Sequence, residues 1–372
     1  MNWVQFHQRS QDLASAAHAA RVAGRDDYAL ELFSKAADYE VDAVKSLVLG
    51  EKPRTYGVIA VSAAALLYKA GRKQESESFS HSCLGAAGLP DFAVDELREL
   101  LQVIWNEYAQ DDAGVSFAGG QITVSVDGGE VVRGGAPLDL IVEKVQAIQN
   151  IFYRTTEFLK NMPLRRRGAA TKEIQGMCRP WLFQSVPGSY QFSVALQAPP
   201  QGDLFEENGL DPELVSSTFM AVLEAAASDP QNQLKGLVPD EEYRSTFLKL
   251  ARNLAPTGKQ FTSLEVRSSC ERAPVFLSKE SRISMTRAIR DGHDIEGKEK
   301  FEVLELRGVL RAVHLEKDWL ELASDSGLIH ISGVGETIDD VIGPMVNHHV
   351  VVHAIKGLKG FRFSDIEFDG DA

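Results

Sequence analysis

Residues 134–163 read GGAPLDLIVEKVQAIQNIFYRTTEFLKNMP and predict one long helix around which the chain is organised. A glycine pair interrupts the preceding structure, and Pro137 then stands where proline is favoured, at a first helical position. From Leu138 to Thr156, apolar residues recur at spacings of three and four. This spacing is typical of an amphipathic helix with one broad apolar face.

The segments on either side of this helix predict a central α/β or α+β domain, residues 117–290. A β-hairpin is expected before the helix, with strands at 122–126 and 131–132 and a turn at 127–129, because apolar and polar residues alternate around Asp127-Gly128-Gly129. After the helix we expect a short helix at 169–179, a strand at 190–195, helices at 212–228 and 240–254, and strands at 261–267 and 275–277.

Residues 1–110 have helical patterning throughout, and one pattern occurs twice. Ala23-Gly24-Arg25 returns as Ala70-Gly71-Arg72, with the two glycines 47 positions apart, and a large apolar residue follows each glycine after eight positions, Leu32 and then Phe79. Small residues, a turn glycine and a large apolar residue in this order resemble tetratricopeptide-like αα-hairpins. The resemblance implies a helical array that presents a groove to a partner protein.

Residues 298–372 contain about five short apolar segments separated by glycine-bearing turns. They predict a small β-barrel of OB-like or SH3-like type, with a single helical turn at 338–342. The expected fold is therefore multi-domain α+β, with domains at 1–110, 117–290 and 298–372. The layout of the whole chain looks similar to that of uncharacterised bacterial proteins.

Composition excludes several classes of protein. Hydrophobic residues make up 44% and charged residues 25% of the 372 residues, which is the average for a globular protein. No apolar run approaches the roughly 20 residues of a membrane-spanning helix, so we expect no membrane partner. The three cysteines (Cys83, Cys178 and Cys270) are far apart in sequence, which favours free thiols in the cytoplasm. The net charge of −14 opposes nucleic acid over the surface as a whole.

No catalytic, metal or cofactor motif is found. His349 and His353 would be about 13 Å apart along a strand, too far to share one metal ion. Gly188-Ser189 is not part of a G-x-S-x-G elbow, and Cys178 has no histidine near it in sequence. Gly333-Val334-Gly335 lacks the third glycine of a dinucleotide-binding loop. We therefore expect no cofactor, and we lean against an enzyme.

A basic segment is the feature with the clearest bearing on function. Arg165, Arg166, Arg167, Lys172 and Arg179 lie within fifteen residues of an acidic chain, and Trp181, Phe183 and Tyr190 follow them. The segment could be a solvated turn paired with the chain's own carboxylates, a contact for an acidic protein, or a nucleic-acid contact. Since arginines are costly to bury, most of the three consecutive ones should be exposed.

These observations predict a non-catalytic, cytoplasmic scaffold or adaptor that binds a protein partner through its helical groove, as a component of a multi-protein bacterial system. The alternative is a nucleic-acid-binding component that uses Arg165–Arg167 and the terminal barrel. The third hypothesis is an enzyme whose site is assembled from residues dispersed in sequence.

Overall fold

The computed structural model describes residues 2–112, 117, 120–132, 135–183, 190–197, 210–268, 273–294, 303–335, 337–357 and 360–370. The fold mixes helices and sheets. The chain forms two compact units, one of residues 1–114 and 184–188, the other of residues 115–183 and 189–372. Each unit is described by itself.

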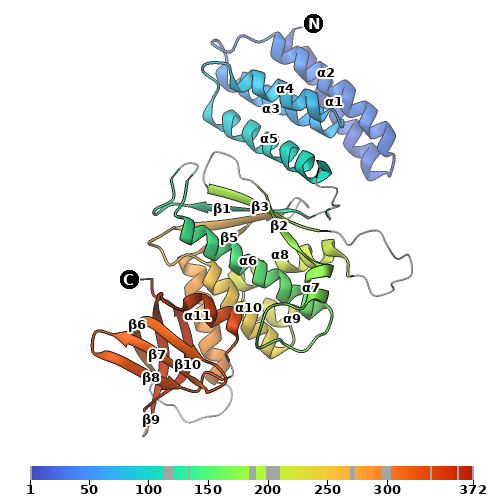
Figure 1. Ribbon diagram of the computed structural model, residues 1–372. Coiled ribbons are helices and arrows are strands. Elements are labelled where there is room, and N and C mark those ends of the chain that lie inside the picture. Colours follow the sequence, from blue (N-terminus) through green and yellow to red (C-terminus); the bar gives the residue numbers. More distant parts are fainter. Residues whose placement is uncertain are drawn as a thin grey trace. The chain divides into compact units, whose positions relative to one another are not determined.

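The first unit is helical, as its patterning predicts (Figure 1). Its helices are α1 (Trp3–Val22), α2 (Asp26–Lys45), α3 (Pro53–Lys69), α4 (Lys73–Leu84) and α5 (Asp91–Asp112). Alanines dominate the buried faces where α1, α2 and α3 meet, together with the buried ring of Phe33. Leu32 is buried, whereas Phe79 is partly buried and packs against the same core.

The two hairpin turns of this unit have the same geometry. Gly24 and Gly71 both have positive φ, 71° and 76°, which glycine adopts without steric cost. The amide of Arg25 donates to the Ala20 carbonyl at 3.0 Å, and the amide of Arg72 donates to the Leu67 carbonyl at the same distance. The repeated tripeptide therefore ends α1 and α3 in the same way, with a left-handed glycine cap.

The second unit begins with a five-stranded sheet of order β2-β3-β1-β4-β5, in which all paired strands are antiparallel. Its strands are β1 (Ile122–Asp127), β2 (Pro180–Phe183), β3 (Tyr190–Leu196), β4 (Ser263–Ser268) and β5 (Val275–Ser278). The helices are α6 (Leu138–Leu159), α7 (Lys172–Met177), α8 (Pro212–Ser228), α9 (Gln233–Leu237), α10 (Glu241–Leu254) and α11 (Lys279–Asp294). They gather on one side of the sheet in Figure 1, and their apolar faces share one core with it.

The expected local hairpin at 122–132 is wrong. β1 pairs with β3 on one side and with β4 on the other, while Val132 forms only an isolated bridge to Gly135. The turn after β1 is held by the segment before β4, since the Thr262 amide donates to the Asp127 carbonyl at 2.9 Å. The alternating pattern identifies the strand correctly, but it carries no information about which distant strands pair with it.

The rest of the second unit is a C-terminal sheet of five strands, which pair around a closed ring in the order β10-β8-β7-β6-β9. The strands are β6 (Val303–His314), β7 (Trp319–Ser324), β8 (Gly327–Ser332), β9 (His349–Gly357) and β10 (Gly360–Phe368). Neighbours are antiparallel except β8 and β10, which are parallel. Between β8 and β9 lie the single helical turn α12 (Asp339–Ile342), which the sequence predicts, and a short 3-10 turn (Gly343–Met345).

Candidate functional site

The loop between α6 and α7 holds the three consecutive arginines, and it is bound to other parts of the second unit. Arg165 donates from Nε to Glu157 Oε1 at 2.8 Å and from Nη2 to Asp340 Oδ2 at 3.1 Å. Arg166 forms an ion pair with Glu242, with 2.7 Å between Nη2 and Oε1. These carboxylates belong to α6, α12 and α10.

Arg167 has backbone partners instead. Its guanidinium donates to the carbonyl oxygens of Gly335 and Thr337, just before α12. The expectation that most of the three arginines are exposed is therefore wrong, because each is only partly exposed. Acidic and carbonyl groups that are more than 70 positions away in sequence surround Arg166 and Arg167, and sequence spacing does not predict them.

The other two predicted contacts are exposed. Lys172 is the first residue of α7, and the Arg179 guanidinium lies 6.0 Å from the centre of the Trp181 ring. Phe117 packs edge-on against the rings of Trp181 and Phe183, at centroid distances of 5.5 and 5.3 Å. Two of the three aromatic side chains that follow the basic segment therefore already pack against another ring of the protein.

A buried arginine that sequence analysis missed lies behind this loop. The Arg154 side chain of α6 is fully buried, and its Nη1 and Nη2 donate to Glu157 Oε2 at 3.0 Å and to Asp340 Oδ2 at 2.5 Å. Glu157 and Asp340 each serve two arginines, Arg154 and Arg165. The two cations and two carboxylates balance, and they bind α12 to α6. The available signal was an arginine three positions before a glutamate in a helix.

A second buried ion pair joins α10 to β10. Arg252 is fully buried, and it donates to Asp365 through Nη1 at 2.5 Å and Nη2 at 3.3 Å. Its Nη2 also donates to the Ile366 carbonyl at 2.6 Å. Burial alone would raise the pKa of Asp365, but the positive charges of Arg252 and Lys249 outweigh it and lower that pKa to about 2. Asp365 is therefore ionised at neutral pH.

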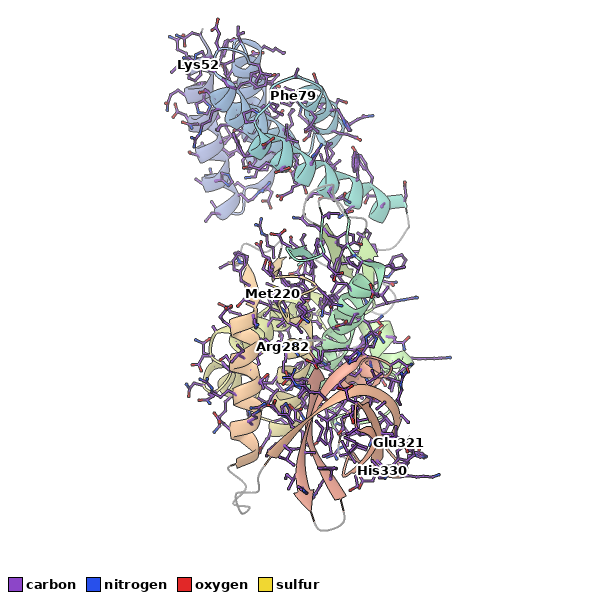
Figure 2. The ribbon with its side chains drawn as sticks, turned by 90° about the vertical axis from the view of Figure 1, so that its left-hand side faces the viewer. Lys52, Phe79, Met220, Arg282, Glu321 and His330 are labelled. Atoms are coloured by element: carbon purple, nitrogen blue, oxygen red, sulfur yellow. The ribbon has the colours of Figure 1, made fainter. Side chains whose placement is uncertain are left out.

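A third set of charged groups continues along β10 (Figure 2 labels Arg282). Glu367 accepts hydrogen bonds from Arg282 Nη2 at 3.2 Å and from His353 Nε2 at 3.1 Å. Arg282, on α11, also donates to the Arg252 carbonyl at 2.7 Å. Burial lowers the pKa of Arg282. These contacts bind α11 to the C-terminal sheet and leave Arg282 and Glu367 neutralised by partners inside the protein.

The two cysteines that the structure describes, Cys83 and Cys178, are both buried. Burial raises the pKa of the Cys178 thiol to about 11, which removes the thiolate that a nucleophile needs at neutral pH. Burial also raises the pKa of Cys83, and Cys270 lies outside the described residues. Within the part of the chain that the structure describes, no group of three or more His, Cys, Asp or Glu side chains could hold a metal ion. His349 is exposed, while His353 is buried against Glu367.

One face of the C-terminal sheet carries a row of aromatic rings that sequence analysis did not assemble. His314, Trp319 and His330 lie on β6, β7 and β8, with ring centroids 5.7 Å apart for the first pair and 5.4 Å for the second. Glu321 faces His330 across β7 and β8, 3.9 Å from its Nδ1 (Figure 2). We call these three rings the aromatic row.

In the helical unit, α5 carries two partly exposed apolar side chains on one face, and the ring of the first, Phe92, also lies against Gly57 of α3. Phe92 and Val103 are 37% and 41% exposed. They are eleven residues apart, which is close to three helical turns, so both lie on the same face of the helix. The exposed Glu96 lies between them on this face. We call these residues the α5 outer face.

Among the helices of the described residues, none has the length and apolar character that crossing a bilayer requires. The sequence matches no protein-family model, and comparisons with curated proteins and with solved structures find no match.

Proposed function

We propose that this protein is a non-catalytic cytoplasmic adaptor that binds a protein partner through its helical unit. The exposed apolar residues of the α5 outer face carry this proposal. In helical arrays, the last helix normally has a polar outer face because no further repeat covers it. Phe92 and Val103 depart from that rule. A partner that covers them would remove both side chains from water.

Two further features support an adaptor of this kind. The hairpin that is used twice, with the same cap at Gly24 and Gly71, is tetratricopeptide-like in architecture, and such arrays present extended binding surfaces. Glu96 adds negative charge between the two apolar residues. A partner that complements this face would be a peptide or helix that combines basic and apolar side chains. Such an adaptor would act within a multi-protein bacterial system.

The test is affinity capture of the tagged full-length chain from its host, compared across matched variants. We expect a co-purified protein to be retained by the unaltered chain and lost from the Phe92→Ser, Val103→Ser double variant. Val142→Ser is the control, because Val142 is also an exposed helical valine, 54% exposed on α6 of the other unit. Equal recovery with all three chains would contradict the use of the α5 outer face.

A second candidate function is the binding of single-stranded nucleic acid by the C-terminal sheet. The strand order around the ring, the parallel pair β8 and β10 and the helical turn between β8 and β9 favour an OB-like barrel over an SH3-like one. OB-like barrels bind oligonucleotides on the face of their second and third strands. Here these strands carry Trp319 and His330 of the aromatic row, and such rings can stack on bases.

The charge distribution favours the adaptor over this candidate. The net charge is −14, and the side chains of Arg165 and Arg166 are paired with carboxylates of the chain itself. We expect no oligonucleotide, single- or double-stranded, to bind tighter than about 10⁻⁵ M near 50 mM salt. Fluorescence anisotropy measures this affinity. Salt-dependent binding tighter than about 10⁻⁷ M that is lost in Trp319→Ala would replace the adaptor with the nucleic-acid function.

A further inference from the structure

A cavity of about 530 Å³ lies where α10 and α11 face the C-terminal sheet. Residues of α10, α11, α12 and β10 form its walls, together with the loop that holds Arg166. The buried apolar residues in these walls are Leu248, Ile289, Ile338, Val341 and Ile366. Pockets that hold small molecules have volumes of roughly 300–1,000 Å³, so the cavity has the size of a ligand site.

The cavity is polar at one end and apolar farther in. Glu241 and Glu242, at the start of α10, are exposed, and Arg166 pairs with Glu242 there. Arg244 is partly exposed and donates to the Val238 and Pro239 carbonyls. The charged side chains at this rim therefore form an ion pair or hydrogen bonds, or contact water, whereas the apolar residues of the walls are buried.

Lys249 lines the cavity from α10 and is partly exposed, whereas its neighbour in sequence, Leu248, is buried. Among the described residues, its ammonium has no hydrogen bond and no ion-pair partner. Burial lowers the pKa of Lys249, and the negative charge of Asp365 only partly offsets this effect.

Asp365 does not neutralise Lys249, because it is already paired. Both carboxylate oxygens of Asp365 accept hydrogen bonds from Arg252. Arg252 is not among the lining residues and already binds both carboxylate oxygens of Asp365, so Lys249 is left without a direct ion-pair partner among the described residues. An anion that enters the cavity would gain a charge-assisted hydrogen bond to an ammonium that has no hydrogen-bond partner among the described residues.

We propose that this cavity binds a small organic anion with an apolar body, whose charged group pairs with Lys249 and whose body packs on Leu248, Ile289 and Val341. A cation would meet the positive charge of the Lys249 ammonium, and a neutral apolar molecule would leave that ammonium unpaired against an apolar surface. The site is independent of the adaptor surface, because it lies in the second unit and the α5 outer face lies in the first. The occupant would contact both the helices and the C-terminal sheet, so it would also stabilise their packing.

The test uses the full-length chain and two probes, octanoate and 1-naphthoate, with octanamide as the uncharged match of octanoate. Isothermal titration calorimetry should detect at least one of the anions with a Kd below about 1 mM. Octanamide should bind at least tenfold more weakly than octanoate where octanoate binds. This comparison needs no variant, so it does not depend on how a substitution affects folding. Absence of binding by both anions, or equal binding of octanoate and octanamide, would overturn the proposal.

Variants then assign the charge to Lys249. Lys249→Met should weaken the anion at least tenfold, and Lys249→Arg, which keeps the charge, should restore most of the affinity. Lys235→Met is the matched control, because Lys235 is an exposed lysine on α9 outside the cavity, and it should bind as the unaltered chain does. Circular dichroism verifies the fold of each variant. Unchanged affinity in a folded Lys249→Met chain would place the anion elsewhere and refute the assignment.

Discussion

Replacement of Asp365 by Asn should destabilise the second unit by about 3–5 kcal/mol, the usual result of removing one partner of a buried ion pair. The substitution leaves Arg252 fully buried with an amide where it had a carboxylate. The lowered pKa of Asp365 supports the magnitude, since a change from 3.8 to about 2 corresponds to roughly 2 kcal/mol in favour of the charged form alone.

Urea unfolding followed by tryptophan fluorescence measures this loss. The chain has four tryptophans, and replacement of Trp3, Trp105 and Trp181 by Phe leaves Trp319 on β7 as the reporter of the C-terminal sheet. Glu305→Gln is the control, because Glu305 belongs to the exposed Arg290–Glu305 pair of the same unit, and it should change stability by less than about 1 kcal/mol.

A double variant decides whether the charge is the cause. Arg252→Met combined with Asp365→Leu replaces both buried charges with apolar groups, and it should recover much of the stability that Asp365→Asn loses. If Asp365→Asn costs less than about 1 kcal/mol, or if the double variant is no more stable than the single one, the reasoning about this pair is refuted.

Three further predictions concern stability. Gly71→Ala should lower the free energy of unfolding by about 1–2 kcal/mol because the φ of Gly71 is positive, although the added methyl group would meet no atom within 4 Å. Gly50 has similar space and no positive φ, so Gly50→Ala should leave stability almost unchanged. An equal loss of stability in both variants would refute the argument that Gly71 is needed as a cap. Leu32→Ala should lower the free energy of unfolding, measured in urea, by about 2–5 kcal/mol because Leu32 is buried. Leu30 is exposed, so Leu30→Ala should lower it by less than about 1 kcal/mol. A loss that small for Leu32→Ala would contradict the position of Leu32 in the core. The Asp365 carboxylate contributes stability above its ordinary pKa of 3.8, and this contribution is lost as the pH falls toward about 2. Acid unfolding of Asp365→Asn should lack that pH dependence, and identical acid-unfolding profiles of the two chains would contradict the prediction.

Most helices and strands could be predicted because their patterns are local. The apolar spacing over 138–159 predicts α6, and the alternation at 190–195 predicts β3. Three elements were not predicted, namely the five-residue helix α9, the helix α11 and the strand β2. α11 has few apolar residues, and only Met285 and Ile289 of its hydrophobic side chains are buried, so its apolar pattern is short. The strand β2 spans four residues, too few for alternation to be visible.

The polar contacts of the second unit could not be predicted from spacing. Arg154 and Asp340 are 186 positions apart, and Arg252 and Asp365 are 113 positions apart. The sequence does not distinguish an arginine that becomes buried from one that stays in water. Only the fold determines which carboxylate pairs with it. Sequence analysis therefore selected the three consecutive arginines, which form a visible run, and overlooked the isolated arginines that are buried completely.

The signs of the buried charges explain why the C-terminal sheet and the helices belong to one compact unit. Arg154, Arg252 and Arg282 lie on α6, α10 and α11, whereas the carboxylates that face them across this junction, Asp340, Asp365 and Glu367, lie on α12 and β10. Separation of the two parts would remove these carboxylates from Arg252 and Arg282, whereas Arg154 would keep its pair with Glu157 on the same helix. Breaking even one buried pair is costly, so each part depends on the other for its charge balance. The helices up to α11 and the strands from β6 onward differ in architecture, but the ion pairs between them predict a single cooperative unfolding unit.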